Sequence, residues 1–129
     1  MAISRSCKHL VQVLLRKSIR RDKKLDAVIG TEVVSFGQRG ASDYLLHKNR
    51  RRKILYVNRH NRSRSNGDSG KKENWRESGM YTPGFWSRWV LWNLPDLRAS
   101  LRNTEERFCI RIETDPSVKS FTKNRKRRS

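Results

Sequence analysis

Apolar side chains near the N-terminus recur at the spacing of an α-helix. Basic residues fill the opposite side, and the match to the i, i+3, i+4, i+7, i+8 template comes from Cys7, Leu10, Val11, Leu14 and Leu15. The pattern predicts an amphipathic helix over residues 4–24. Three interpretations stay open: a packed helix with a basic side facing solvent or nucleic acid, a mitochondrial transit peptide, and a helix on an anionic membrane.

Short β-branched runs follow. Residues 27–36 read AVIGTEVVSF, which predicts one strand or a hairpin pair with Gly30 as a bulge or turn. Residues 37–43 are expected to form a loop and residues 44–46 a short element. The run at 53–58, KILYVN, alternates as a strand does, although its flanking arginines could instead continue into a helix.

The second half of the chain is rich in aromatic residues at helical spacing. Thr82 can cap a helix whose first residue is Pro83. Phe85, Trp89 and Trp92 then follow i, i+4, i+7, and packing in the core is the favoured interpretation for both tryptophans. A second helix capped by Asp96 and an alternating strand over residues 108–114 complete this part.

These elements predict a small single α+β domain with an N-terminal amphipathic helix, short strands, a Trp-rich helical segment and basic flexible segments. Its parts are a basic helix-plus-strand part at 1–60, a polar flexible loop at 61–79, a Trp-rich helix-strand part at 80–116 and a basic tail at 117–129. Only 34% of the residues are hydrophobic, so the core must be small.

Charge adds the strongest functional signal. The 129 residues include 31 Lys+Arg and 12 Asp+Glu, which gives a formal net charge of +19. Such a charge repels itself in a compact chain, and a polyanionic partner compensates it. Nucleic acid is the favoured partner, and a membrane is not favoured because no apolar run approaches the length of a span.

The charge is concentrated in two segments, residues 48–64 and the C-terminal residues 123–128. Arginine outnumbers lysine in the first, which contains no acidic residue, and the guanidinium fork favours RNA over DNA as the ligand. A solvated basic loop or a nuclear import signal is the alternative. The predicted nucleic-acid-binding residues are Lys48, Arg50, Arg51, Arg52, Lys53, Arg59, Arg62 and Arg64 in the first segment, and Lys123, Arg125, Lys126, Arg127 and Arg128 in the second.

Aromatic side chains offer a second kind of contact. Trp75 and Trp86 are candidates for base stacking or for contact with a protein partner. Cys7 and Cys109 are far apart in sequence and are expected to be reduced thiols, with Cys7 packed on the apolar side of the first helix.

Catalytic chemistry and cofactors find no support in the sequence. The chain lacks metal-ligand spacing, a phosphate-binding glycine loop and a dinucleotide fingerprint, so neither a metal nor a cofactor is expected. Glu105 and Glu106 are adjacent on a helix and do not face each other. The sequence therefore predicts no enzyme.

Two functions remain. The favoured one is a non-enzymatic RNA-binding component of a ribonucleoprotein assembly, which would contact the phosphate backbone and other proteins of the assembly. The alternative is a viral-type accessory or regulatory protein with nuclear localisation signals and an aromatic surface that binds a host protein. An intracellular location is expected in both, in the nucleus, nucleolus or mitochondrion.

Overall fold

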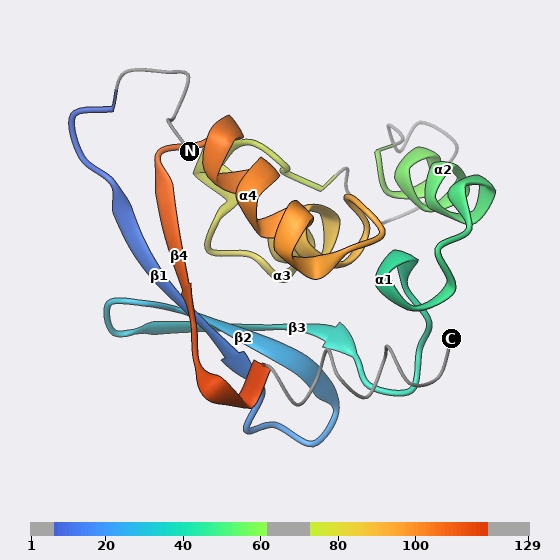
Figure 1. The fold of residues 1–129 in the computed structure, drawn as a ribbon, viewed down its shortest axis with the longest axis horizontal. Helices are drawn as coiled ribbons and strands as arrows, with labels where there is room; N and C mark the ends of the chain where they lie inside the picture. Colours follow the sequence, from blue (N-terminus) through green and yellow to red (C-terminus); the bar gives the residue numbers. More distant parts are fainter. Residues whose placement is uncertain (1–6, 62–72, 119–129) are drawn as a thin grey trace, which may run out of the picture.

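The computed structural model describes residues 7–61 and 73–118, which form a small α+β domain and confirm the predicted fold class (Figure 1). A four-stranded sheet runs in the order β3-β2-β1-β4, with β1 and β4 parallel and the other neighbours antiparallel. Helices α3 and α4 lie together beside the sheet, and α1 and α2 extend beyond its end (Figure 1). The strands are β1 (Val11–Lys17), β2 (Lys23–Ile29), β3 (Glu32–Gln38) and β4 (Ile110–Thr114).

Six helical segments lie wholly within the described parts of the chain. Four are α-helical, one is a 3₁₀ turn (η1) and one is a π-helical turn (η2). In chain order they are α1 (Tyr44–His47), α2 (Arg50–His60), η1 (Glu77–Gly79), α3 (Pro83–Trp86), η2 (Ser87–Leu91) and α4 (Leu97–Arg107).

The helix predicted for residues 4–24 is wrong where the structure describes it, because β1 and β2 form an antiparallel hairpin there. Val13 and Leu15 are buried on the core side of β1, whereas Leu14 lies on the other side. Leu14 and Leu15 together complete a helical pattern, but the same residues also fit a strand with one apolar residue on its outer side. Pairing with β4, a partner distant in sequence, selects the strand.

The hairpin predicted for residues 27–36 is confirmed as β2 and β3. Gly30 lies in the connecting turn with φ of +61°, a left-handed conformation that a glycine adopts without the strain of a side chain. Strand β3 extends to Gln38, so the loop that follows is shorter than expected. The short element expected at residues 44–46 is α1, capped by the Asp43 carboxylate.

The strand predicted for residues 53–58 is wrong, and the helical alternative holds. Asn49 caps α2 by accepting a hydrogen bond from the Arg52 amide. Tyr56 is the one buried residue of this helix, while Ile54 and Leu55 are exposed. A strand would have required burial of an alternating set, and the apolar residues here are too few to provide it.

The Trp-rich part follows the predicted order of elements. Pro83 begins α3, and the Asp96 carboxylate accepts the Ala99 amide at the start of α4. Between them, η2 widens the helix by one residue, since the Trp92 amide donates to the Ser87 carbonyl. The predicted cap at Thr82 stands at the right position, but its side chain makes no capping hydrogen bond.

Strand β4 brings the two ends of the described chain together. It pairs with β1 in the register Val11↔Ile110 and Val13↔Ile112, so the parts predicted on either side of residues 61–79 share one sheet. Cys109 directly precedes β4, and its carbonyl accepts the Val11 amide. Cys7 and Cys109 form a disulfide across a sequence separation of 102 residues, and the expectation of two reduced thiols is therefore wrong.

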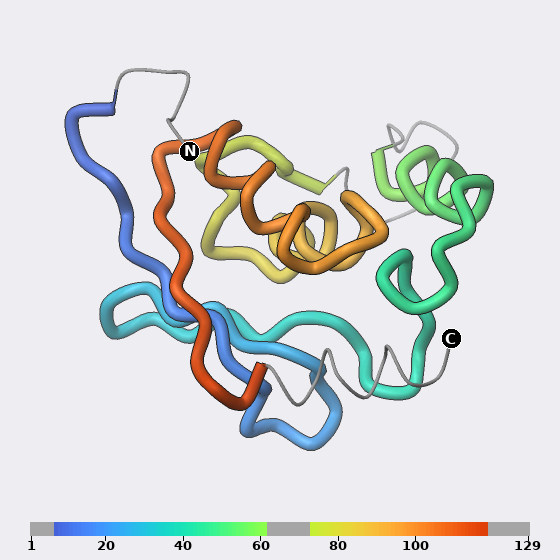
Figure 2. Tube along the Cα trace, in the orientation of Figure 1, coloured from blue at the N-terminus to red at the C-terminus, as the bar shows by residue number. Residues whose placement is uncertain are grey.

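The core lies between the sheet and the α3–η2–α4 helices. Phe36, Phe85 and Trp86 are fully buried, and the Trp86 indole donates its N–H to the Met80 carbonyl. Phe108 contacts both Phe85 and Trp89 through its ring. Helix α2 stands outside this core at the edge of the domain (Figure 2).

Candidate nucleic-acid interface

The basic segment predicted from the sequence is an exposed helix. Helix α2 begins with Arg50, Arg51 and Arg52, all of them exposed, and Arg59 is exposed near its end. No acidic residue occurs in this helix, and none of these four arginines forms an ion pair within the described residues. The helix therefore presents four guanidinium groups to solvent on one short element.

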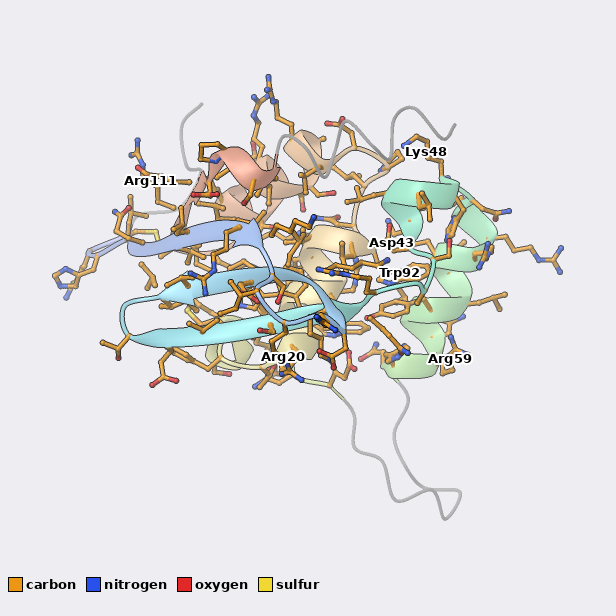
Figure 3. The ribbon with its side chains drawn as sticks, turned by 90° about the horizontal axis from the view of Figure 1, so that it is seen from below. Arg20, Asp43, Lys48, Arg59, Trp92 and Arg111 are labelled. Atoms are coloured by element: carbon orange, nitrogen blue, oxygen red, sulfur yellow. A yellow bond between two sulfur atoms is a disulfide. The ribbon has the colours of Figure 1, made fainter. Side chains whose placement is uncertain are left out.

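The two lysines of this segment are instead attached to the domain. Lys48 ends α1 in a left-handed conformation, with φ of 53°, and its ammonium donates to the Leu45 and Pro95 carbonyls at 2.8 and 2.9 Å. Lys53 donates to the Asn93 carbonyl at 2.6 Å. These contacts join α1 and α2 to the loop before α4. Figure 3 shows Lys48 and Arg59 at opposite ends of this α1–α2 unit.

The remaining predicted basic residues lie outside the residues that the structure describes. This holds for Arg62 and Arg64, and for the whole C-terminal cluster of Lys123, Arg125, Lys126, Arg127 and Arg128.

Aromatic stacking attaches α2 to η2. The Tyr56 and Trp92 rings are parallel within 2° with centroids 4.2 Å apart, and the His60 ring lies 4.1 Å from that of Tyr56. Burial is the main cause that raises the pKa of the Tyr56 phenol far above its ordinary value, so the ring stays neutral. Figure 3 shows Trp92, which directly follows η2, on the side of α2 that faces the rest of the domain. The stack holds α2 in a fixed position without using its arginines.

The two tryptophans proposed for stacking have different surroundings. Trp86 is fully buried in the core, where no base or partner protein reaches it. Trp75 is half-buried, and its indole donates to Glu73 at 2.9 Å. Of the two rings, only that of Trp75 retains an accessible part.

Two arginines that the sequence analysis missed lie beside these aromatic rings. The Arg88 guanidinium lies 4.4 Å from the Trp89 ring centre and 5.3 Å from that of Trp75. Arg107 also lies 4.4 Å from the Trp89 ring centre. The adjacent residues Arg88 and Trp89 are a weak sequence signal for a cation–π contact. The contact of Arg107 with the same ring depends on how α4 packs, which the sequence does not show.

Lys53 and Arg88 experience mainly positive neighbours. Burial, followed by the positive charges of Arg88 and two further arginines, lowers the pKa of Lys53. Burial and then the charge of Arg107 lower the pKa of Arg88. A cation whose pKa falls is destabilised by its surroundings, and a bound anion would relieve that destabilisation.

The outward side of α2 is not purely basic. Ile54 is 47% exposed and Leu55 is 58% exposed, and both lie on the side of the helix away from Tyr56. Apolar side chains between arginines can contact either the sugars and bases of a nucleic acid or a protein.

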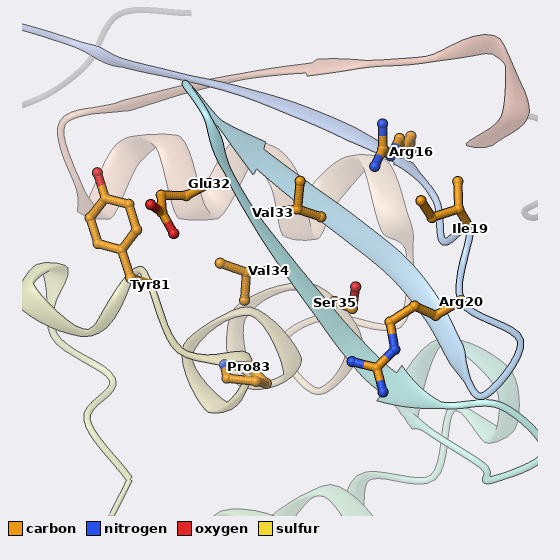
Figure 4. Close-up of a pocket in the computed structure, with 9 residues that line it drawn as sticks. All are labelled: Arg16, Ile19, Arg20, Glu32, Val33, Val34, Ser35, Tyr81 and Pro83. Atoms are coloured by element: carbon orange, nitrogen blue, oxygen red, sulfur yellow. The ribbon is translucent and has the colours of Figure 1, made fainter.

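A second basic surface, with different chemistry, lies beside the β1–β2 turn. A hollow of about 420 Å³ opens against the sheet, with Arg16, Arg20 and Tyr81 among the side chains around it (Figure 4). Arg16 pairs with the buried carboxylate of Asp26 at 3.1 Å, and Arg20 pairs with Asp22 at 3.2 Å. Both guanidinium groups here already have an anionic partner.

Groups with other chemistry are few in the parts of the chain that the structure describes. No three His, Cys, Asp or Glu side chains gather as metal ligands there, and the two cysteines are joined in the disulfide. Lys24 and Asp43 form a buried ion pair between β2 and the start of α1. Within residues 7–61 and 73–118, no helix has the length and apolar character needed to cross a membrane.

Comparison with known proteins gives one match. A model described as a family of unknown function (DUF5754) matches residues 13–60, which run from β1 to the end of α2 and make up less than half of the chain. No curated protein and no solved structure matches the chain. The matched region contains the strands β2 and β3, most of β1, and the basic helix α2.

Proposed function

We propose that this protein binds RNA without catalysis, through phosphate contacts made mainly by α2. The observation that carries the proposal is the charge of this helix, whose four exposed arginines have no acidic neighbour on the helix and no ion pair within the described residues. Exposed cations gain little from a folded chain that lacks counter-ions near them. A polyanion supplies those counter-ions and releases its own condensed ions on binding.

The contacts that hold α2 in place favour a role in binding, rather than a surface that is only solvated. The helix is held by the Tyr56–Trp92 stack and by the lysine contacts to the loop before α4, so its arginines project from a fixed position. A preformed helix loses less conformational entropy on binding than a flexible basic tail. Guanidinium groups also bind phosphate with two parallel hydrogen bonds and stack on unpaired bases, which favours RNA.

The biological setting that fits these features is a ribonucleoprotein assembly. A small core, a net charge of +19 and a surface that neutralises phosphate suit a protein that holds RNA in place. Binding by backbone contacts carries little sequence information, so affinity should vary little among RNAs of similar shape.

The test is the salt dependence of RNA affinity. Replacing Arg50, Arg51 and Arg52 together by Ala removes three charges from the start of α2. The slope of log affinity against log salt should become shallower by about 2 to 3, because each lost phosphate contact changes it by about 0.7 to 1. Fluorescence anisotropy with a labelled hairpin RNA over a series of salt concentrations measures this slope.

The matched control removes the same charge elsewhere. Arg20, Arg21 and Arg39 are exposed at the β1–β2 end of the domain, and their joint replacement by Ala leaves α2 intact. The control should keep most of the wild-type slope. Equal losses in both triple variants would mean that net charge alone governs binding, and the proposal for α2 would be wrong.

A second candidate function is contact with a protein partner through α2. The exposed Ile54 and Leu55 favour it, since they form an apolar site within a basic surface that suits an acidic partner. Leu55→Ser should then abolish partner binding and leave the RNA salt slope unchanged. A loss of RNA affinity in that variant with no protein partner recovered would exclude this alternative.

A further inference from the structure

The two edges of the sheet differ in what covers them. Strands β3 and β4 are the outer strands of the order β3-β2-β1-β4. At β4, the Ile112 amide donates to the Glu105 carboxylate at 2.7 Å, so α4 satisfies part of that edge. At β3, the backbone of residues 32–37 makes hydrogen bonds only to β2 within the described residues. The outer edge of β3 therefore keeps backbone donors and acceptors that the described part of the chain does not use.

The composition of β3 leaves this edge without the usual protection. Its sequence, EVVSFGQ, contains no Lys, Arg or Pro, the residues with which proteins commonly shield an edge strand from other chains. Residues 25–38 as a whole contain none of the 31 Lys and Arg residues of the protein. Two copies of so basic a chain repel each other over most of their surfaces. The edge of β3 is a place where a second copy meets little of that repulsion.

Exposed apolar side chains gather beside the same edge. Five large apolar side chains are exposed in the part of the chain that the structure describes, and three of them line the hollow against β3 (Figure 4). These three are Ile19, Val33 and Tyr81, with exposed fractions of 79%, 48% and 56%. Apolar side chains gathered next to an open strand edge are typical of a surface that another chain covers.

The two ends of this edge have opposite charges. Figure 4 shows Glu32 and Tyr81 at one end of the hollow and Arg20 at the other. Arg39 directly follows the last residue of β3. Glu32 and Arg39 are both exposed, and neither side chain has an ion pair in residues 7–61 and 73–118. The edge thus begins at an acidic side chain and ends at a basic one, each without an ionic partner there.

An antiparallel copy of β3 would match these charges. Two β3 strands that run in opposite directions bring Glu32 of each copy to the end of the strand where Arg39 of the other lies. A two-fold axis repeats the contact, so both acids and both arginines gain a partner. Opposite charges on paired strands are stabilising, and like charges are destabilising. This self-complementarity favours a second copy of the chain over an unrelated strand.

We propose that the outer edge of β3 is a dimer interface, at which a second copy of this chain adds its own β3 antiparallel and joins the two sheets into one. Backbone hydrogen bonds between the strands supply most of the affinity, as in other cases of strand addition. Exposed apolar side chains around the edge, Val33 among them, lose contact with water in the dimer. No residue of α2 lines the hollow, so pairing at β3 does not require RNA.

Sedimentation equilibrium of the full chain, without RNA and at an ionic strength of about 0.15 M, tests the dimer. The wild-type protein should show a reversible equilibrium between monomer and dimer with no larger species, because the two-fold contact uses both β3 edges. Val33→Lys places a lysine at an exposed position of the edge strand and should raise the dissociation constant about tenfold or more. A wild-type protein that stays monomeric up to about 1 mM, or that associates without limit, would overturn the interface.

Charge reversal tests the direction of the pairing. Glu32→Arg and Arg39→Glu each bring like charges together at both ends of the interface, and each should raise the dissociation constant about tenfold or more. A chain that contains both substitutions has the same pair with its charges exchanged. That double variant should dimerise within about threefold of wild type, because the two effects are coupled through one contact. Failure of the double variant to recover, when both single variants are folded and weakened, would exclude the antiparallel arrangement.

The matched control changes the same charge on the other edge. Arg111 is exposed on β4, and Arg111→Glu alters the net charge as much as Arg39→Glu does. It should leave the dissociation constant within about twofold of wild type. Equal weakening by both substitutions would show that net charge governs association, and a dimer unaffected by Val33→Lys would place the contact elsewhere. A wild-type monomer whose β3 amides become protected from hydrogen exchange only when another protein is added would assign the edge to a foreign strand and defeat the dimer.

Discussion

The arginines of the β1–β2 hairpin and those of α2 lie on separate parts of the domain and have opposite surroundings. Arg16 pairs with a fully buried carboxylate, and Arg20 pairs with an exposed one. The arginines of α2 have no acidic residue on their helix and no ion pair within the described residues. The hairpin arginines act on the fold, whereas the α2 arginines remain available to an external anion.

This difference shows that a net charge of +19 does not describe the binding surface by itself. Some of the positive charges, such as that of Arg16, are neutralised by an acidic partner within the fold. Others, those of the α2 arginines, have no acidic residue on their helix. Substitutions in the paired hairpin group should therefore change the free energy of unfolding, whereas substitutions of the α2 arginines should change RNA affinity.

The largest expected effect is on the paired side. Asp26 is fully buried and accepts hydrogen bonds from Arg16 and from the Ser35 hydroxyl at 2.7 Å. Asp26→Ala should lower the free energy of unfolding by about 3 to 5 kcal/mol, because it leaves Arg16 without its buried partner. Urea unfolding measures the loss. RNA affinity, measured where the variant is folded, should stay within about twofold of wild type.

A matched acid on the neighbouring strand provides the control. Glu32 is exposed on β3, and Glu32→Ala should change the free energy of unfolding by less than about 0.5 kcal/mol. If Asp26→Ala changed the free energy of unfolding as little as Glu32→Ala does, the Arg16–Asp26 pair would not stabilise the fold. The hairpin arginines would then not differ from the α2 arginines in their effect on stability.

The same pair predicts a dependence of stability on pH. Burial of Asp26 opposes ionisation, but hydrogen bonds from Ser18, Ser35 and Arg16 outweigh it and lower its pKa below the usual 3.8. A carboxyl with a depressed pKa contributes stability above its unfolded pKa and loses it as the pH falls through its folded value. Stability should therefore decline below about pH 4, and Asp26→Asn should flatten that decline in urea titrations.

The disulfide is the next largest contribution on the sheet side. Cys7 and Cys109 close a loop across 102 residues, and their Cα atoms are 5.7 Å apart beside the β1–β4 pair. Reduction should lower the free energy of unfolding by about 2 to 4 kcal/mol, mainly by releasing the unfolded chain from this constraint. Denaturation with and without a thiol reductant measures it. The Cys7→Ser, Cys109→Ser double variant should show the same loss and no response to reductant.

RNA affinity is the discriminating readout for that experiment. Helix α2 is attached through Tyr56, Trp92 and Lys53, whereas the disulfide lies beside the β1–β4 pair. The reduced, folded protein should bind RNA as the oxidised protein does. A large loss of affinity on reduction would show that the two regions are coupled and that the comparison between them is too simple.

Local signals in the sequence predicted the elements whose causes are local. Gly30 marked the β2–β3 turn, Pro83 the start of α3 and Asp96 the start of α4. Each depends on a backbone preference or a cap within a few residues. The α+β class follows from these elements together.

Features that depend on distant partners could not be read in this way. The sequence around Leu14 fits a helix and a strand equally well, and only its pairing with β4 distinguishes them. The disulfide depends on the same pairing, because it is β4 that brings Cys109 to Cys7. The cluster around Trp89 was invisible for the same reason, since Arg107 reaches that ring only after α4 packs on η2.

The basic segment itself was identified correctly as a charged stretch but not as a helix. The apolar run at Ile54–Val57 alternates too briefly to decide between the two periods. The cap at Asn49 is a local signal for the helix. The inward positions of Lys53 and Tyr56 depend instead on the helix being placed against Trp92 and the loop that follows it.

The smallest expected effect separates position from net charge. Asp22→Asn frees the exposed Arg20 from its partner and adds one positive charge near the hairpin. Stability should change by less than about 0.5 kcal/mol, because an exposed ion pair contributes little. If binding depends on the placement of α2, RNA affinity and its salt slope should stay at wild-type values in anisotropy titrations. An increase in affinity as large as the decrease caused by Arg51→Ala would show that the hairpin surface binds RNA once its arginines are unpaired. Pairing, rather than the position of α2, would then determine which part of this basic protein contacts phosphate.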